Sequence, residues 1–161
     1  MNPTQHIYDF ATQVRSSKEF FERSTRVLDE SDSQFRPCEG MMTVAQQVAH
    51  AAQTIEWFID GAERPEGFDL HFEEHAKALA EVRSLNEARH RLENAYIRAM
   101  DFLRGKTPEE LERPLPEGLV MGGRPRYEVI SSLVEHTAHH RGALTVYSRL
   151  LGKVPVMPYG G

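Results

Sequence analysis

Cysteine is almost absent from this chain of 161 residues, since Cys38 is its only one. An internal disulfide is therefore impossible, and a reducing compartment is the expected environment. Long hydrophobic runs are absent as well, because no apolar stretch approaches the ~20 residues that a membrane-spanning helix requires. The first residues also lack the basic segment and apolar segment of a secretory signal. The sequence therefore predicts a cytoplasmic protein that does not enter a membrane.

An excess of basic charge is also missing. The 19 Lys and Arg side chains are outnumbered by 24 Asp and Glu, which gives a formal net charge of −5. Proteins that bind nucleic acid or an anionic membrane through their surface charge normally carry the opposite sign. Neither partner is expected here. The length and the 40% of hydrophobic residues are typical of one globular domain, which we expect to cover residues 1–161.

Hydrophobic periodicity predicts an all-α protein. Four long helices are expected, over about residues 3–28, 44–61, 85–104 and 127–151. Two substantial connections separate them, one with a short helical piece at 72–82 and one with two prolines and three glycines at 115–125. The second of these predicts a crossover loop or a small hairpin. Long connections allow neighbouring helices to run parallel, so the pattern favours a four-helix bundle with crossovers.

Local signals mark where two of the long helices begin. Thr43 is followed three residues later by Gln46, and Ser84 is followed three residues later by Glu87. Each pair has the spacing of a capping box, in which the two side chains satisfy free backbone N–H groups at a helix start. The sequence therefore predicts helix starts directly after Thr43 and Ser84.

His136 and His140 are the most informative of the eight histidines. They lie four residues apart within an apolar stripe of the last expected helix, whose other members are Val129, Leu133, Ala143, Tyr147 and Leu151. An unpaired polar group away from water costs about 1–3 kcal/mol. One divalent metal ion can satisfy two imidazoles that lie one helical turn apart. The alternative is a pair of core histidines that form hydrogen bonds to groups on facing helices.

His50 is the candidate third ligand. It lies about 120° from the centre of the apolar face of the second helix, where a side chain can face a cleft between helices. Thr54 and Trp57 follow on the same side of that helix and are expected to line a pocket, with Tyr147 as a further wall. A solvated histidine at the edge of the helix is the simpler alternative for position 50.

Other candidate motifs are weaker. The segment 71–75 contains His-x-x-Glu-His, an inverted form of a zinc-protease motif. Both of its histidines lie off the apolar line of a short, charged helix, so we expect a solvated face there. His139 is expected to flank the pair at 136 and 140. No carboxylate lies within the apolar stripe of the last helix, so the sequence names no general acid or base.

Four segments together resemble the DinB/YfiT-like family. They are residues 42–50, which lead to His50, and residues 136–142, 147–152 and 154–160. The resemblance spans essentially the whole chain, and its most specific part is a single histidine combined with His-x-x-x-His-Arg-Gly. It implies an up-down-down-up four-helix bundle, usually a homodimer, that holds one divalent ion through three histidines. The matching positions are His50, His136 and His140, whereas Ala143 stands where many members carry glutamine.

The resemblance also implies a class of reactions. Characterised relatives include transferases that use a low-molecular-weight thiol and a thiol-dependent isomerase. Three neutral imidazoles leave at least one position open on a divalent ion, which lowers the pKa of a water or thiol bound there. We therefore expect a metal-dependent S-transferase or hydrolase that acts on a small molecule. Zn is the first expectation for the ion, with Ni, Fe or Mn as alternatives.

Two other interpretations of the sequence remain open. The histidines could hold a metal in a non-catalytic, regulatory dimer of helical bundles. They could also be core residues that bind no metal.

Overall fold

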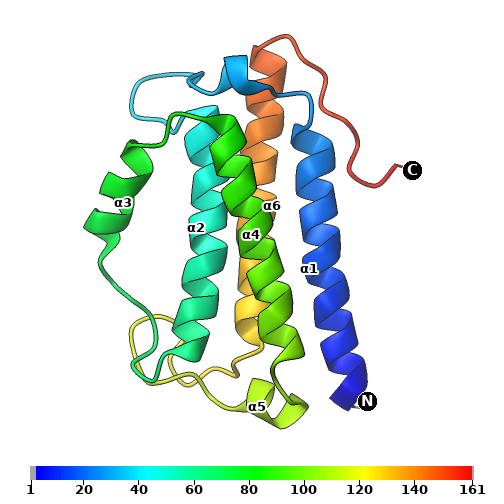
Figure 1. Cartoon of the computed structure of the whole chain (residues 1–161), viewed down its shortest axis with the longest axis vertical. Helices are drawn as coiled ribbons and strands as arrows, with labels where there is room; N and C mark the ends of the chain where they lie inside the picture. The colour runs from blue at the N-terminus through cyan, green and yellow to red at the C-terminus, as the bar shows by residue number, and fades with distance from the viewer. Residues whose placement is uncertain (1–2, 161) are drawn as a thin grey trace.

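The computed structural model describes residues 3–160, and the side chains of residues 9–160. The described chain is helical with irregular connections and has no strand longer than an isolated bridge, so the predicted all-α class is confirmed. Its elements are α1 (Pro3–Thr25), η1 (Glu30–Asp32), α2 (Val44–Glu63), α3 (Phe72–Ala80), α4 (Leu85–Arg104), α5 (Pro108–Glu112) and α6 (Glu128–Leu150) (Figure 1). None of these helices combines the length and apolarity needed to cross a bilayer.

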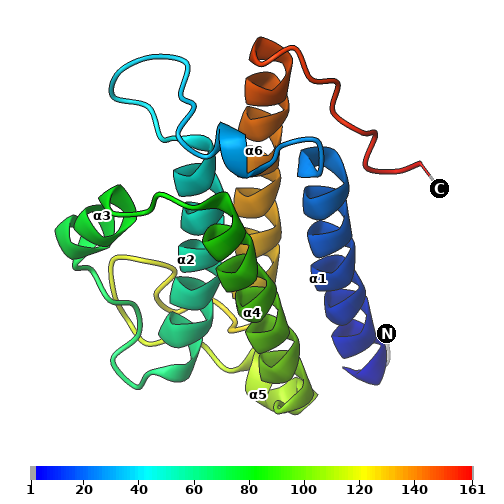
Figure 2. The same ribbon diagram turned by 45° about the horizontal axis from the view of Figure 1, so that its top comes forward.

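The four long helices α1, α2, α4 and α6 lie side by side (Figure 1). In that view α1 and α6 run upward and α2 and α4 run downward. The most extensive helix contacts are those of α2 with α4, followed by α2 with α6 and α1 with α6. Because α2 and α4 point the same way, the chain between them has to return along the outside. The short helix α3 lies in this return, beside α2 and outside the four long helices in both views (Figure 2).

Caps fix where the helices begin. The Thr43 side chain accepts a hydrogen bond from the backbone N–H of Gln46, and the Gln46 side chain accepts one from the N–H of Thr43. This confirms the predicted capping box at the start of α2. At the start of α4, the Ser84 hydroxyl accepts a hydrogen bond of 3.1 Å from the N–H of Glu87, but the Glu87 side chain does not return the bond, so only half of the predicted box forms there. Both helices begin directly after these residues, as their spacing predicts.

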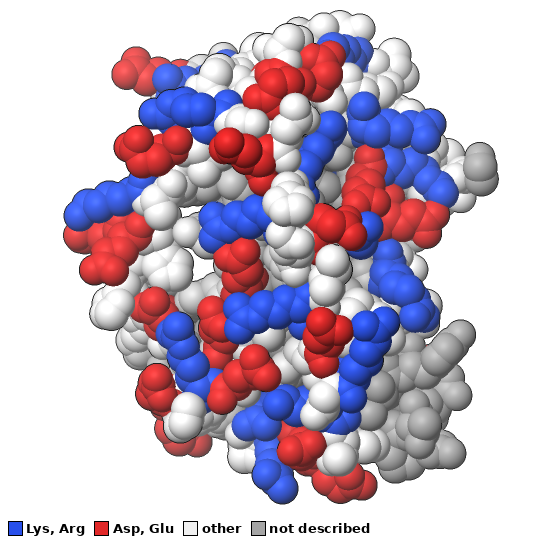
Figure 3. Space-filling view, viewed as in Figure 1, with Lys and Arg blue, Asp and Glu red and all other residues white. Residues whose placement is uncertain are grey.

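Ion pairs join the parallel helices α2 and α4 on the outside. Arg91 donates to both carboxylate oxygens of Glu56, with distances of 2.6–3.2 Å, and Arg98 pairs with Asp60. Acidic and basic side chains are interspersed over the face of the molecule shown in Figure 3. Like-charged patches therefore do not build up on this face, and opposite charges on neighbouring helices hold each other.

The buried face of α6 differs in detail from the predicted stripe. Its buried members are Val129, Ile130, Leu133, Thr137, His140, Leu144, Tyr147 and Ser148. The face is turned slightly from the expected line because α6 packs against α1 as well as α2. As a result His136 and Ala143, expected at the centre, are only half-buried. This rotation brings His136 to the margin of the α6 core while His140 stays inside it.

The glycine-rich connection before α6 turns back on itself once. Pro114 and Pro125 form an isolated antiparallel bridge, and the N–H of Leu115 donates to the carbonyl of Arg124 over 2.8 Å. The expected small hairpin is therefore reduced to a single bridged loop, because proline at both positions cannot donate to a longer ladder.

Two helical glycines give a matched test of packing around the Trp57 side chain. A Cβ at Gly61 in α2 would overlap the ring of Phe68, which packs on Trp57 with 4.7 Å between ring centroids, whereas a Cβ at Gly142 in α6 would meet nothing within 4 Å. Both changes to alanine gain the same helix propensity, about 1 kcal/mol. We expect Gly61→Ala to have an unfolding free energy about 1–3 kcal/mol below that of Gly142→Ala, measured by urea denaturation. Equal values for the two variants would show that Phe68 moves aside freely.

Candidate metal centre

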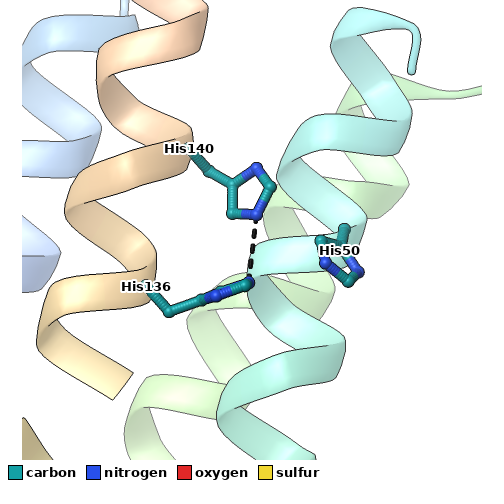
Figure 4. Close-up of side chains that lie close together, drawn as sticks. All are labelled: His50, His136 and His140. Carbon is teal, nitrogen blue, oxygen red and sulfur yellow. Dashed lines mark hydrogen bonds between the residues drawn. The ribbon is translucent and has the colours of Figure 1, made fainter. Parts of the chain in front are cut away.

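Three histidines from two helices converge in the interior of the molecule. His50 comes from α2, and His136 and His140 come from successive turns of α6 (Figure 4). The ring centroids lie 4.9 Å apart for His50 and His140, 5.2 Å for His50 and His136, and 4.6 Å for the two on α6. One donor atom from each ring lies within 4.8 Å of the other two. The structure thus brings together the three residues that the sequence proposes as ligands.

The spacing on α6 fits a shared ion. The Nε2 atoms of His136 and His140 are 3.0 Å apart. Two nitrogens that bind one ion at about 2.1 Å, roughly 90–110° apart, are separated by about 3.0–3.4 Å. His140 lies deepest, with 5% of its surface exposed, and His50 and His136 are half-buried. This donor set of neutral nitrogens is one that divalent transition metals prefer.

Burial keeps these imidazoles neutral. It lowers the pKa of His140 to about 3 and that of His136 to about 4, and the neighbouring imidazoles add to both shifts. Burial is also the main cause that lowers the pKa of His50. A histidine binds a metal through an unprotonated nitrogen, so all three rings are in the form that binds an ion at neutral pH.

A chain of hydrogen bonds determines which nitrogen His140 presents. The carbonyl of Met42 can only accept, so the hydroxyl of Tyr147 donates to it over 3.1 Å. The amide nitrogen of Gln47 then donates to the Tyr147 oxygen over 3.3 Å. This orientation turns the Gln47 carbonyl oxygen to Nδ1 of His140, 2.5 Å away. Nδ1 must therefore carry the hydrogen, which leaves Nε2 of His140 with a free lone pair at the centre of the cluster.

His50 has a similar arrangement. The amide nitrogen of Gln53 donates to the backbone carbonyl of His75 over 3.2 Å, which turns its oxygen toward Nδ1 of His50 at 3.4 Å. The longer distance makes this a weaker constraint than the one on His140. Nε2 is again the nitrogen left free. Because the His140 Nε2 accepts, the hydrogen between it and His136 belongs to His136, and an ion at the cluster would replace that hydrogen.

A cavity of about 370 Å³ opens beside the cluster, between α2, α3 and α6. Its wall is largely apolar and also contains the side chains of His50 and His136. The other wall residues are Met42, Gln53, Thr54, Trp57, Phe58, Phe72, His75, Ala76 and Leu79. Trp57 and Thr54, proposed from the sequence, both line it, and the Thr54 hydroxyl is satisfied by the carbonyl of His50 at 2.9 Å.

Tyr147 does not line this cavity, contrary to the sequence-based expectation. It is buried with 2% of its surface exposed, and its ring packs edge-on against Phe35 with 6.0 Å between centroids. Tyr147 follows His140 by two turns of α6, which places it beyond the cluster and next to Met42 at the start of α2. Its contribution is to hold Gln47 rather than to form a wall.

Three residues of the site were missed from the sequence. Gln47 and Gln53 lie three positions before and after His50, so a helix places them close to it. A polar residue within the apolar face of a helix is the signal that could have indicated Gln47. In the structure Gln47 is buried, with 8% of its surface exposed. His75 was expected on a solvated face. It lines the cavity instead. Only His71, whose side chain is 72% exposed, lies on the solvated face that was expected for both histidines.

The remaining histidine near the cluster is not part of it. The His139 ring lies 5.0 Å from that of His140 and 6.4 Å from that of His136, and the residue is exposed. In the part of the chain that the structure describes, the only group of His, Cys, Asp or Glu placed to hold an ion contains His50, His136 and His140. His139 is therefore a natural control for substitutions in the cluster.

Comparison with known proteins bears on the whole chain. The DinB family model matches residues 1–161. No match was found among curated proteins.

The neutral cluster predicts a pH dependence of stability for the metal-free protein. His136 and His140 have pKa values of about 4 and about 3 in the folded state, against an ordinary histidine pKa of 6.5. Between these values the unfolded chain binds more protons, so stability is full above pH 6.5 and falls as the pH drops. We expect a loss of up to about 1.4 kcal/mol per pH unit for each histidine between pH 6.5 and 5, measured by urea denaturation. Replacing both residues with glutamine should flatten this slope, and an unchanged slope would contradict the assignment.

The role of Gln47 predicts a loss of metal affinity when its oxygen is removed. Gln47→Leu leaves Nδ1 of His140 without an acceptor, so we expect affinity for Zn²⁺ to fall about 10–100-fold. Gln47→Glu keeps an oxygen in place and should bind within a few fold of the parent. Tyr147→Phe removes only the group that holds Gln47 and should lie between the two. Competition with a chromogenic chelator measures all three, and equal affinities for the Leu and Glu variants would show that His140 is oriented by something else.

Proposed function

Because this chain belongs to the DinB family, we propose that it is a metal-dependent enzyme that binds one divalent ion through His50, His136 and His140. The proposed reaction is transfer of a low-molecular-weight thiol to a small electrophile, or hydrolysis of a small molecule. The directions of the four long helices support an up-down-down-up bundle of the DinB type (Figure 1). We further propose that the protein acts as a homodimer in the cytoplasm.

The open side of the cluster is the observation that carries this proposal. A structural zinc site normally has four protein ligands and is closed, whereas a catalytic site keeps one position for water or substrate. The group found in the described chain has three ligands. Two of them, His50 and His136, also form part of the wall of the 370 Å³ cavity. An ion bound by these three rings would be reached from that cavity.

The residues around the cluster support chemistry at such an ion. When bound, a divalent ion acts as a Lewis acid and lowers the pKa of a water or thiol at its open position. Gln47 and Gln53 keep the Nε2 atoms of His140 and His50 directed inward. Apolar side chains such as Trp57, Phe58 and Leu79 form much of the cavity wall, and an apolar wall strengthens the electrostatic interactions beside it.

The apolar wall favours thiol transfer over hydrolysis. Apart from the histidines, Gln53 and Thr54, the side chains that line the cavity are apolar or aromatic. Such a cavity binds the apolar part of an electrophile. Zn²⁺ is the first ion to test, with Ni, Fe and Mn next, because imidazole suits each of these metals.

The proposal predicts metal content by residue. Purified protein loaded with Zn²⁺ and dialysed should retain about one equivalent by elemental analysis, and His140→Ala should retain less than about a tenth, because a catalytic zinc needs its three ligands. His139→Ala removes a neighbouring imidazole that is not in the group, so it should keep the full equivalent. Absence of metal uptake by the parent protein would reject the proposal. Equal loss in both variants would show that position 140 has no special role.

The reaction class needs a second measurement. The metal-loaded protein is incubated with an aryl electrophile, 1-chloro-2,4-dinitrobenzene, and a panel of small thiols, and separately with p-nitrophenyl esters. We expect thiol-dependent turnover of the electrophile that is lost in His140→Ala and kept in His139→Ala. Turnover of the esters alone would assign hydrolysis, and metal binding without either reaction would favour a regulatory role.

A further inference from the structure

His75 is a histidine of the cavity wall that does not belong to the metal cluster. It comes from α3, and it borders the same cavity of about 370 Å³ as His50 and His136. It is not in the group of residues placed to hold an ion, as far as the described chain shows. Its backbone carbonyl accepts the amide of Gln53, whose oxygen faces His50. One glutamine thus joins His75 to a ligand of the cluster.

The ring of His75 has a carboxylate partner. Its Nε2 lies 3.2 Å from Oδ2 of Asp69. Asp69 is itself held in place: its Oδ1 accepts the backbone N–H of His71 over 2.8 Å, and its carbonyl accepts the indole N–H of Trp57 over 2.7 Å. The N–H of His71, followed by the ring of His75, holds the pKa of Asp69 below its usual range. Asp69 therefore remains a carboxylate, and its acceptor oxygen requires that Nε2 of His75 carry a hydrogen.

This arrangement leaves Nδ1 of His75 as its reactive nitrogen. Within the described chain no hydrogen bond is recorded to this atom. With Nε2 protonated, Nδ1 of the neutral ring has a free lone pair. An imidazole held by a carboxylate in the correct tautomer is the arrangement that enzymes use for general base catalysis.

His75 also lines two different hollows. A second hollow of about 260 Å³ adjoins the cavity, and His75, Gln53 and Trp57 line both. The charged residues that line this second hollow are Glu56, Asp60, Arg64, Asp69, Glu74 and Arg91. The wall of the 370 Å³ cavity beside the cluster is mainly apolar and contains few groups that can accept a proton. His75 is the titratable side chain, among the residues that line them, that contacts both spaces.

We infer that His75, positioned by Asp69, is the general base that accepts the proton of the thiol at the border between the reaction cavity and the charged hollow. This inference rests on the proposed function. A thiol R–SH that enters the cluster loses its proton to Nδ1 of His75, which gives R–S⁻ and an imidazolium. The carboxylate of Asp69 stabilises the imidazolium. The Nδ1 proton then passes to water, and the ring returns to the neutral form with its hydrogen on Nε2. Asp69 acts through His75 and is a positioning residue.

The rate of thiol binding tests the inference without knowledge of the substrate. The protein loaded with Co²⁺ is mixed at pH 7 with 2-mercaptoethanol, most of which is protonated at this pH. Formation of the sulfur-to-cobalt charge-transfer band is followed by stopped flow. We expect His75→Ala and His75→Gln to form the same final band about 10²-fold more slowly, because general base catalysis contributes on this order. Asp69→Asn should slow it by a smaller factor.

His71→Ala is the matched control. Nδ1 of His71 also contacts Asp69, at 3.0 Å, but this side chain is 72% exposed and does not line the cavity. Its variant should bind the thiol at the rate of the parent protein. In addition, 1,2-dimethylimidazole, whose methyl groups hinder metal binding, should restore the rate of His75→Ala in proportion to its concentration. A structural role for His75 would not give this rescue.

Two failures are distinguishable. If the parent protein binds no Co²⁺, or forms no sulfur-to-cobalt band, the proposed function fails and the role of His75 fails with it. If the parent forms the band and the His75 variants form it equally fast, the metal site stands and the inference about His75 is overturned. A slower rate without rescue by the added base also overturns it.

Discussion

A neutral imidazole has one nitrogen that donates and one that accepts, and the site depends on which one each histidine turns to the centre. For His140 the tautomer is determined by the carbonyl of Met42. It ends the chain of hydrogen bonds that runs from His140 through Gln47 and Tyr147. A carbonyl cannot donate, so every donor in this chain points the same way. Metal ligands in proteins are commonly oriented by such outer hydrogen bonds. Here the orienting groups are built into the packing of α2 against α6.

The helix α2 carries most of this arrangement. Gln47, His50 and Gln53 follow one another at intervals of three, and α2 contacts α3, α4 and α6. Alanine occupies much of the buried face of α2, at positions 45, 49, 51, 52 and 62. These small side chains let the neighbouring helices approach closely. Close approach is what allows rings on α2 and α6 to come within 5.2 Å of each other. The same helix therefore supplies a ligand, the groups that orient two ligands, and the space in which they meet.

The sequence predicts this protein well where the information is local. The capping box at Thr43 and the pair on α6 follow from spacing along one helix. His50 followed from its place at the margin of α2 combined with the family resemblance. The expected role of Tyr147 was wrong because helical phase gives the side of the helix on which a side chain lies, and not what it meets two turns further along the axis. His75 was misplaced for a different reason. The helix α3 is short and charged, so its own pattern does not show that Gln53 of α2 bonds to the carbonyl of His75, or that Trp57 bonds to that of Asp69 just before α3.

The direction of the helices explains why there is a cavity at all. If α2 were followed by a short turn, the next helix would run antiparallel to it and no chain would be needed outside the bundle. Because α2 and α4 run the same way, residues 64–84 must return along the flank, and α3 lies there, beside α2 and outside the four packed helices (Figure 2). A helix in this position meets α2 along one side only, which leaves the 370 Å³ space next to His50 and His136. It also brings His75 and Asp69 to the boundary between an apolar space and a charged one. The crossover connection thus supplies both the opening of the site and the titratable residue at its edge.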